Sequence, residues 1–180
     1  MSIHTNIEMG KVYAGEAQIG EIYRGSELMY KAEVVVYDGV ALADGYTYES
    51  KGYNSKTHGL FYAKSRYNDA GGKTEEAYCY VPVDCTGYEK LTVEYSAVVS
   101  AYGDAIVSLC NVALTTLSRT ELNKLENDAV HIFTTDITTN SVEEETIDIS
   151  GISGVKYLTV GTYNTQGNQT DAVITKVVLE

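Results

Sequence analysis

Tryptophan is absent from this 180-residue chain, which also has only one proline, three cysteines and three histidines. Three cysteines leave one unpaired whatever bridge is drawn, so the chain is not a disulfide scaffold. Cys79 and Cys110 lie in apolar runs typical of strands, where cysteine packs as a small hydrophobe, and we expect buried thiols throughout. The histidines His4, His58 and His131 form no ligand-spaced pair, so the sequence predicts no metal site and no cofactor.

Basic residues are also scarce, because 13 lysines and arginines stand against 25 aspartates and glutamates, a formal net charge of -12. Binding to phosphate backbones or to anionic membranes needs a basic face, so we expect no nucleic-acid partner. No run approaches the roughly 18 consecutive apolar residues of a membrane span, and residues 1–10 lack the basic start and apolar core of a secretory signal. We therefore expect no membrane insertion, no signal peptide and folding in a reducing cytoplasm.

Two stretches share the pattern apolar-Asp-apolar-hydroxyl-Gly, at residues 83–87 and again at 147–151. Asp, Ser and Thr side chains bond nearby backbone amides, and Gly accepts positive φ, so each stretch predicts a corner between strands. A run rich in β-branched residues follows each corner, at 90–100 and at 155–163, as expected for strands.

Short strands with little helix between them predict an all-β fold, an antiparallel jelly-roll-type β-sandwich. The expected strands are 34–37, 59–65, 76–81, 90–100, 104–114, 130–134, 142–149, 155–163 and 172–179. We expect Pro82 to end the strand 76–81 and the apolar strand 104–114 to lie centrally in its sheet. Residues 118–121 have capping-box spacing, which predicts at most one short helix before 130.

The chain opens with a ten-residue repeat, in which residues 10–16 match 20–26 and a third strand follows at 27–30. This predicts a small N-terminal β-meander over residues 1–32, with the sandwich domain at 33–180. The repeated apolar-Tyr-x-Gly pattern resembles a short N-terminal segment of tail, baseplate and fibre proteins of bacteriophages and prophages. That resemblance implies an attachment element that docks a distal domain onto a larger assembly. The alternative is an edge hairpin of the main domain.

The sandwich has a resemblance of its own. The Asp-apolar-hydroxyl-Gly corner before the Leu-Thr-Val strand at 91–93 resembles the jelly-roll modules grouped as galactose-binding-like and carbohydrate-binding domains. The resemblance spans residues 33–180 and implies a glycan ligand. The absence of tryptophan departs from the sugar-stacking platform usual in that family.

Residues 46–67 have the composition most typical of a binding site, since they are dense in Tyr, Gly, Ser and Asn. Tyrosine offers a large amphipathic contact at low entropic cost, and the small polar residues supply adaptable hydrogen bonds. The candidate ligand-binding residues are Tyr48, Tyr53, Asn54, Tyr62 and Asn68. The alternative is that these rings close the rim of the sandwich or line its core.

No catalytic residues emerge from the sequence. Glu143, Glu144 and Glu145 are adjacent in a strand, where neighbouring side chains point to opposite faces, so they cannot pair for glycoside hydrolysis. Cys79 falls in mid-strand, which favours a core thiol over a nucleophile. Residues 71–74 superficially resemble the end of a phosphate loop but lack its first glycine and its strand-to-helix context. We therefore expect no enzyme.

Two functional hypotheses follow. The leading one is a non-enzymatic structural or adhesive protein of a phage or prophage tail tip, made in the bacterial cytoplasm and incorporated into the virion tail. Its partners would be other tail subunits or further copies of itself as a homo-oligomer, and a cell-surface glycan as receptor. The alternative is a free carbohydrate-binding module or an accessory domain of a glycan-processing system.

Overall fold

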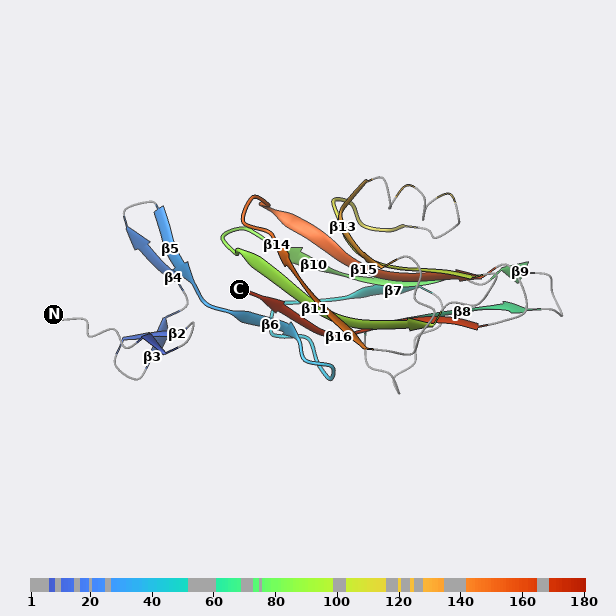
Figure 1. Cartoon of the computed structure of the whole chain (residues 1–180), viewed down its shortest axis with the longest axis horizontal. Helices are drawn as coiled ribbons and strands as arrows, with labels where there is room; N and C mark the ends of the chain where they lie inside the picture. The colour runs from blue at the N-terminus through green and yellow to red at the C-terminus, as the bar shows by residue number, and fades with distance from the viewer. Residues whose placement is uncertain are drawn as a thin grey trace.

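The computed structural model describes residues 7–8, 11–14, 17–19, 21–24, 27–51, 61–68, 73–74, 76–98, 103–115, 120, 124, 128–134, 142–164 and 169–180. Most of these residues lie in strands, and every pair of neighbouring strands is antiparallel. Two layers dominate the molecule, and both run along its long axis (Figure 1).

The first layer is a five-stranded sheet. Its order is β13 (Ala129–Thr134), β12 (Gly103–Cys110), β15 (Val155–Asn164), β10 (Glu76–Asp84) and β7 (Glu49–Lys51). The second layer is a six-stranded sheet. It holds β14 (Glu143–Asp148), β11 (Lys90–Val98), β16 (Gln169–Leu179), β8 (Tyr62–Asn68) and β9 (Lys73–Thr74), with β6 (Val34–Tyr37) paired to β16.

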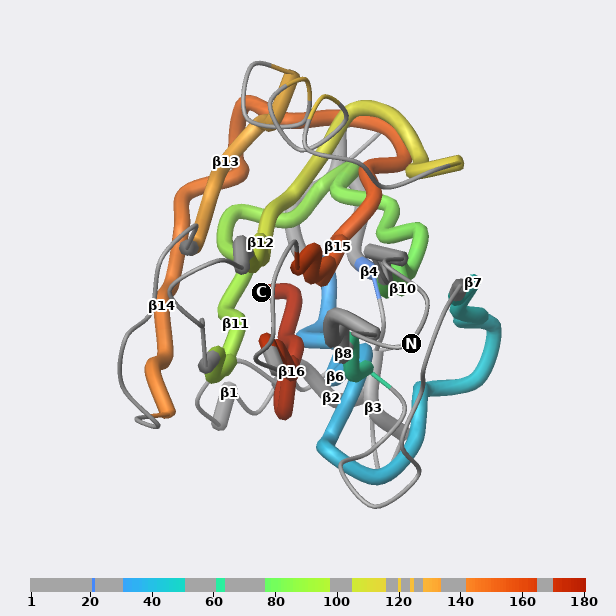
Figure 2. The backbone as a smooth tube through the Cα atoms, turned by 90° about the vertical axis from the view of Figure 1, so that its right-hand side faces the viewer, coloured from blue at the N-terminus to red at the C-terminus, as the bar shows by residue number. Residues whose placement is uncertain are grey.

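Successive strands from β10 onward mostly alternate between the two layers, so β10, β12 and β15 lie in one sheet and β11, β14 and β16 in the other (Figure 2). Alternation of this kind is the mark of a jelly roll, in which two antiparallel sheets share one core. The predicted antiparallel sandwich is therefore confirmed. The expected central position of strand 104–114 is also confirmed, because β12 pairs with both β13 and β15.

The core lies between the layers and follows the two-residue period of the strands. On β10, Ala77, Cys79, Val81 and Val83 are fully buried and point inward. Inward side chains of the facing strands complete the cluster: Leu91, Val93, Tyr95, Leu158, Val160 and Ile174.

Both corner motifs form turns, as predicted. In the first, the backbone N–H of Thr86 donates to Asp84 Oδ1 at 3.0 Å, and Gly87 takes a positive φ of 79°. In the second, the N–H of Ser150 donates to Asp148 Oδ1 at 2.9 Å. The shared sequence pattern thus has a shared cause, an aspartate that bonds the backbone two residues on.

The two corners lie against each other at one end of the sandwich. The N–H of Cys85 donates to the carbonyl of Gly154 at 3.2 Å, and the N–H of Gly154 donates to Thr86 Oγ1 at 2.9 Å. The residue after β16 lies at the same end, because the N–H groups of Glu89 and Lys90 both donate to the main-chain oxygen of Glu180, at 2.6 and 2.9 Å. We call this the corner end.

The N-terminal strands form two small sheets beside the corner end (Figure 1). Strands β1 (Ile7–Glu8), β2 (Lys11–Ala14) and β3 (Ala17–Ile19) make one, and β4 (Glu21–Arg24) with β5 (Glu27–Lys31) makes the other. The expected N-terminal meander of short antiparallel strands is therefore present, divided into two sheets. Among the described residues, β3 pairs with β2 alone and β4 pairs with β5 alone, so the division falls between β3 and β4. The division at residue 32 stays a prediction.

Three further expectations about strand ends and helix can be compared with the structure. Pro82 does not end its strand, because β10 continues to Asp84. Strand β7 pairs only with residues 78–80 of β10, so the N–H that proline lacks falls where β10 has one neighbouring strand. Strand β12 ends at Cys110, short of the expected residue 114, and Val112 is 54% exposed. Of the expected helix, Thr120, Lys124 and Asp128 are described, and all three are helical.

Candidate functional site

The residues predicted to bind a ligand do not converge in the described structure. Tyr48 is half-buried and packs against the core, just before β7 of the five-stranded sheet. Tyr62 begins β8 of the six-stranded sheet and is 3% exposed, so its ring is not open to a ligand. Asn68 ends β8, where its backbone pairs with Lys73. Tyr53 and Asn54 lie outside the described residues, and their role stays a prediction.

A different set of tyrosines shares one surface. On β10, Tyr78 and Tyr80 alternate with the inward-pointing Cys79 and Val81, so they lie on the outer face of the five-stranded sheet. On β15, Tyr157 and Tyr163 alternate in the same way with core residues. The strand register brings the two pairs together, because Tyr80 pairs with Thr159 and Pro82 with Tyr157. We call the surface formed by Tyr78, Tyr80, Tyr157 and Tyr163 the tyrosine face.

The rings of the tyrosine face differ in how much they are covered. Tyr80 and Tyr157 contact each other edge to face, with ring centroids 5.6 Å apart and planes at 85°, and both are half-buried. Tyr163 is also half-buried. Tyr78 is 7% exposed and packs with Ile106, Cys110 and Leu114 in a second apolar cluster outside the main core.

Gly161 explains why Tyr78 reaches that second cluster. Gly161 pairs with Tyr78 on one side and with Ile106 on the other, so no side chain separates the ring from Ile106. Leu114 follows β12 and folds back onto the same outer face. The apolar cluster on β12 therefore borders the three half-buried rings on β10 and β15, and supports them from one side.

The Tyr80 phenol stays protonated at neutral pH. Burial, followed by the charge of Glu49 and the neighbouring Tyr157, raises the pKa of Tyr80 above its ordinary value. Glu49 lies opposite Tyr80 on the edge strand β7. A neutral phenol both donates and accepts hydrogen bonds, so the face combines apolar ring surface with polar tips.

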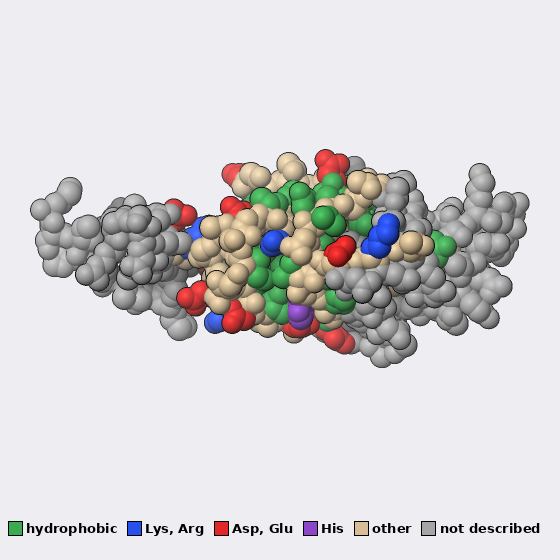
Figure 3. Space-filling model, turned by 90° about the horizontal axis from the view of Figure 1, so that it is seen from above, with side chains coloured by type: hydrophobic (Ala, Val, Ile, Leu, Met, Phe, Trp, Pro, Cys, Tyr) green, Lys and Arg blue, Asp and Glu red, His purple; other side chains and the backbone are tan. Residues whose placement is uncertain are grey.

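The space-filling view from above the five-stranded sheet shows the same character. Hydrophobic side chains, with tyrosine counted among them, gather along the middle of the described surface, and most acidic side chains lie toward its margins (Figure 3).

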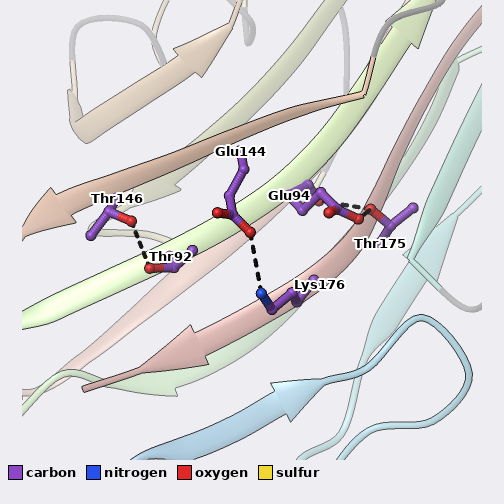
Figure 4. A network of polar contacts seen from close by, with 6 residues as sticks. All are labelled: Thr92, Glu94, Glu144, Thr146, Thr175 and Lys176. Atoms are coloured by element: carbon purple, nitrogen blue, oxygen red, sulfur yellow. Dashed lines mark hydrogen bonds and ion pairs between the residues drawn. The ribbon is translucent and has the colours of Figure 1, made fainter.

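The outer face of the six-stranded sheet is different, because its polar side chains bind one another (Figure 4). Two contacts connect neighbouring strands: Thr92 Oγ1 with Thr146 Oγ1 at 2.8 Å, and Glu94 Oε1 with Thr175 Oγ1 at 2.6 Å. A third contact reaches from β14 across β11 to β16 and joins Glu144 Oε2 to Lys176 Nζ at 3.2 Å. Such cross-strand pairs stabilise a sheet. The polar side chains of this face are therefore explained by their role in stabilising the sheet.

The adjacent Glu144 and Glu145 do not form an acid pair. Glu144 contacts Lys176 on the outer face, whereas Glu145 Oε1 contacts Nε2 of His131 on β13 at 2.8 Å. The prediction that adjacent glutamates point to opposite faces is confirmed.

The cysteines are free and buried, as predicted. Burial raises the pKa of the Cys79, Cys85 and Cys110 thiols, and the shift is largest for Cys79, in the middle of β10. Among the residues that the structure describes, no three His, Cys, Asp or Glu side chains lie close enough to hold a metal ion. In the same part of the chain, no helix has the length and apolar character needed to cross a membrane.

No family model matches the chain, and no curated protein matches it. Solved structures of family 29 carbohydrate-binding modules are similar to it. A mutant of CBM29-2 is 12% identical with a TM-score of 0.39, covering 82% of this chain and 84% of that one. Another CBM29-2 mutant, complexed with cellulohexaose, is 12% identical with a TM-score of 0.36, covering 82% and 89%. CBM29_1 from Piromyces equi is 9% identical with a TM-score of 0.36, covering 82% and 89%.

The three structures are carbohydrate-binding modules by their descriptions. A likeness this remote carries no ligand with it. The comparisons say nothing of the resemblance between the N-terminal repeat and phage tail proteins, which stays a prediction.

Proposed function

We propose that the chain is a non-catalytic glycan-binding module and that the tyrosine face receives the sugar. The observation that carries the proposal is the set of three half-buried rings, Tyr80, Tyr157 and Tyr163, on two neighbouring strands of one regular sheet. A sugar offers CH groups that pack on an aromatic ring and hydroxyl groups that bond the phenol and nearby polar groups. Paired strands hold the rings more firmly than loops would.

The spacing of the rings suits an oligosaccharide better than a single sugar. Tyr157 and Tyr163 are six residues apart on β15, which corresponds to about 20 Å along an extended strand. Tyr80 lies between these two positions, because its partner is Thr159. A ligand that contacts all three rings must therefore extend over several sugar units along β10 and β15.

Charge favours an uncharged glycan. The chain carries a formal net charge of -12, and Glu49 lies beside Tyr80 at the edge of the tyrosine face. An acidic polysaccharide would be repelled by this field, whereas a neutral one would not.

The predicted place of the module in a phage or prophage tail tip is a second candidate, favoured by the position of the N-terminal strands. Strands β1 to β5 pair among themselves in two small sheets and with no strand of the sandwich among the described residues. An attachment element that joins tail subunits or further copies of the chain would have this arrangement. Light scattering on the purified chain tests self-association, and a monomer at all concentrations would count against it.

Binding to a panel of neutral polysaccharides, measured by affinity electrophoresis, tests the glycan proposal. We expect Tyr80→Ala and Tyr157→Ala each to weaken binding about tenfold, because aromatic residues at the centre of an interface carry more than about 1.4 kcal/mol. Thr92→Ala, on the polar face, is the matched control and should bind as the wild type does.

The same assay separates this face from the segment predicted from the sequence. Loss of binding in Tyr53→Ala with unchanged binding in Tyr80→Ala would place the site in residues 46–67. Unchanged binding in both tyrosine-face variants would overturn the proposal.

A further inference from the structure

Lys31 makes three contacts where the N-terminal strands meet the sandwich. Its Nζ donates to the carbonyl of Thr86 at 2.7 Å and lies 4.1 Å from the centroid of the Tyr88 ring. The same ammonium is 3.9 Å from Oε1 of Glu21. Hydrogen bonds with Thr86, and after them the charge of Lys31, hold the pKa of the Asp84 carboxyl in the same corner below its ordinary value.

These contacts connect two structures that share no strand pairing among the described residues. Lys31 is the last residue of β5, and Glu21 is its cross-strand partner on β4, so both belong to the N-terminal hairpin β4–β5. Thr86 and Tyr88 belong to the first corner of the sandwich. Only residues 32 and 33 separate β5 from β6 of the six-stranded sheet.

The surroundings of Lys31 make the contacts effective. Its side chain is 19% exposed, so the ammonium has given up much of its contact with water. A cation within about 6 Å of a ring centroid is attracted by the ring, and the attraction grows as the cation is desolvated. Tyr88 is 6% exposed and belongs to the main core, so the ring cannot swing away.

The first corner is a rigid anchor for the ammonium. The hydroxyl of Thr86 is held by the N–H of Gly154 at 2.9 Å, and the N–H of Tyr88 donates to the carbonyl of Cys85 at 3.2 Å. The carbonyl that Lys31 binds therefore belongs to a turn fixed from both sides.

We propose that Lys31 locks the β4–β5 hairpin to the corner end, so that hairpin and sandwich move as one body. Without this contact the two residues 32 and 33 would act as a hinge. With it, the sandwich is presented at a fixed angle to whatever the N-terminal strands hold. The proposal does not depend on a glycan ligand.

Backbone ¹⁵N relaxation on the full chain tests the lock. In the wild type, amides of β4 and β5 should share the overall correlation time of β10 and β15, with order parameters near about 0.85. In Lys31→Met, which keeps most of the aliphatic stem and removes the charge, the hairpin values should fall below about 0.6 while the sandwich stays unchanged. Lys176→Met removes an equal charge from the surface pair with Glu144 and should leave the hairpin unchanged.

A second measurement does not depend on any variant folding. The Lys31 methylene protons next to Nζ should be shifted upfield by the Tyr88 ring in the wild type. Ordinary shifts for these protons would overturn the proposal. Independent motion of the wild-type hairpin, or an unchanged hairpin in Lys31→Met, would do the same.

Discussion

The hydrogen bond between Tyr95 and Phe133 offers a sharp test of how the two layers are joined. The Tyr95 hydroxyl on β11 donates to the Phe133 carbonyl on β13 at 2.9 Å, and the two rings lie 6.0 Å apart. Strand β11 belongs to the six-stranded sheet and β13 to the five-stranded sheet, so this bond crosses the sandwich. Tyr95→Phe removes the donor and leaves the ring.

The cost of that change follows from burial. Tyr95 is 3% exposed and Phe133 is 7% exposed, so water cannot easily replace the lost donor. A buried carbonyl left without its partner costs about 1 to 3 kcal/mol. For a chain of this length, each kcal/mol lowers the melting temperature by about 2 to 4 °C, which gives a fall of about 2 to 12 °C.

Alkaline pH gives a second readout of the same group. Burial, and then the charges of Glu143 and Glu145, raise the pKa of Tyr95 to about 12. A raised pKa in the folded state means that the phenol contributes stability below its ordinary pKa of about 10 and loses it as pH rises toward 12. Tyr95→Phe has no such proton to lose, so its stability should fall less steeply across this range than that of the wild type.

Urea unfolding at pH 7 and between pH 10 and 12 measures both effects, with equal m-values expected for the two proteins. Tyr163→Phe removes a hydroxyl from a half-buried ring on the outer face and should change stability by less than about 0.5 kcal/mol. The reasoning is refuted if Tyr95→Phe is as stable as the wild type, or if Tyr163→Phe is equally costly.

Three further predictions concern the thiols, the corners and the division of the chain. Cys79 should react with a thiol reagent only after unfolding, and Cys85, at the corner, should be the first to react in the native protein; fast native labelling of Cys79 would show that its burial is wrong. Hydrogen bonds hold the pKa values of Asp84 and Asp148 below their ordinary range, so both stabilise the fold above about pH 4 and lose this contribution as pH falls through the lowered values. The free energy of unfolding of an Asp84→Asn, Asp148→Asn double variant should therefore vary less between pH 2 and 5, and an unchanged profile would count against the corner bonds. Deletion of residues 1–32 should leave a cooperative unfolding transition, because the core residues that the structure describes lie in the sandwich; a molten product would show that the division is wrong.

Local chemistry in the sequence predicted the corners well. An Asp followed two residues later by Thr or Ser can form a turn locally, because its carboxylate accepts a hydrogen bond from the N–H of that residue. Asp84 and Asp148 both do so. The end of β10 was not predictable in this way. Whether Pro82 breaks a strand depends on how far the neighbouring strand β7 extends, and tertiary structure decides the length of β7.

The candidate site was also only partly predictable from the sequence, because it depends on strand pairing. Alternation of Tyr78 and Tyr80 with core residues was visible in the sequence and predicts two rings on one face. Tyr157 and Tyr163 join them only because β10 pairs with β15, some eighty residues away, in one register. Composition drew attention to residues 46–67, yet Tyr62 from that segment is buried.

Chemical-shift mapping with ¹⁵N-labelled protein and a panel of neutral gluco-, manno- and xylo-hexasaccharides tests whether the tyrosine face receives a glycan. We expect the sugar that binds to shift the amides of Tyr78, Tyr80, Tyr157 and Tyr163 and to leave those of Thr92, Thr146 and Thr175 on the polar face in place. Shifts confined to the polar face, or no shift with any sugar of the panel, would contradict it.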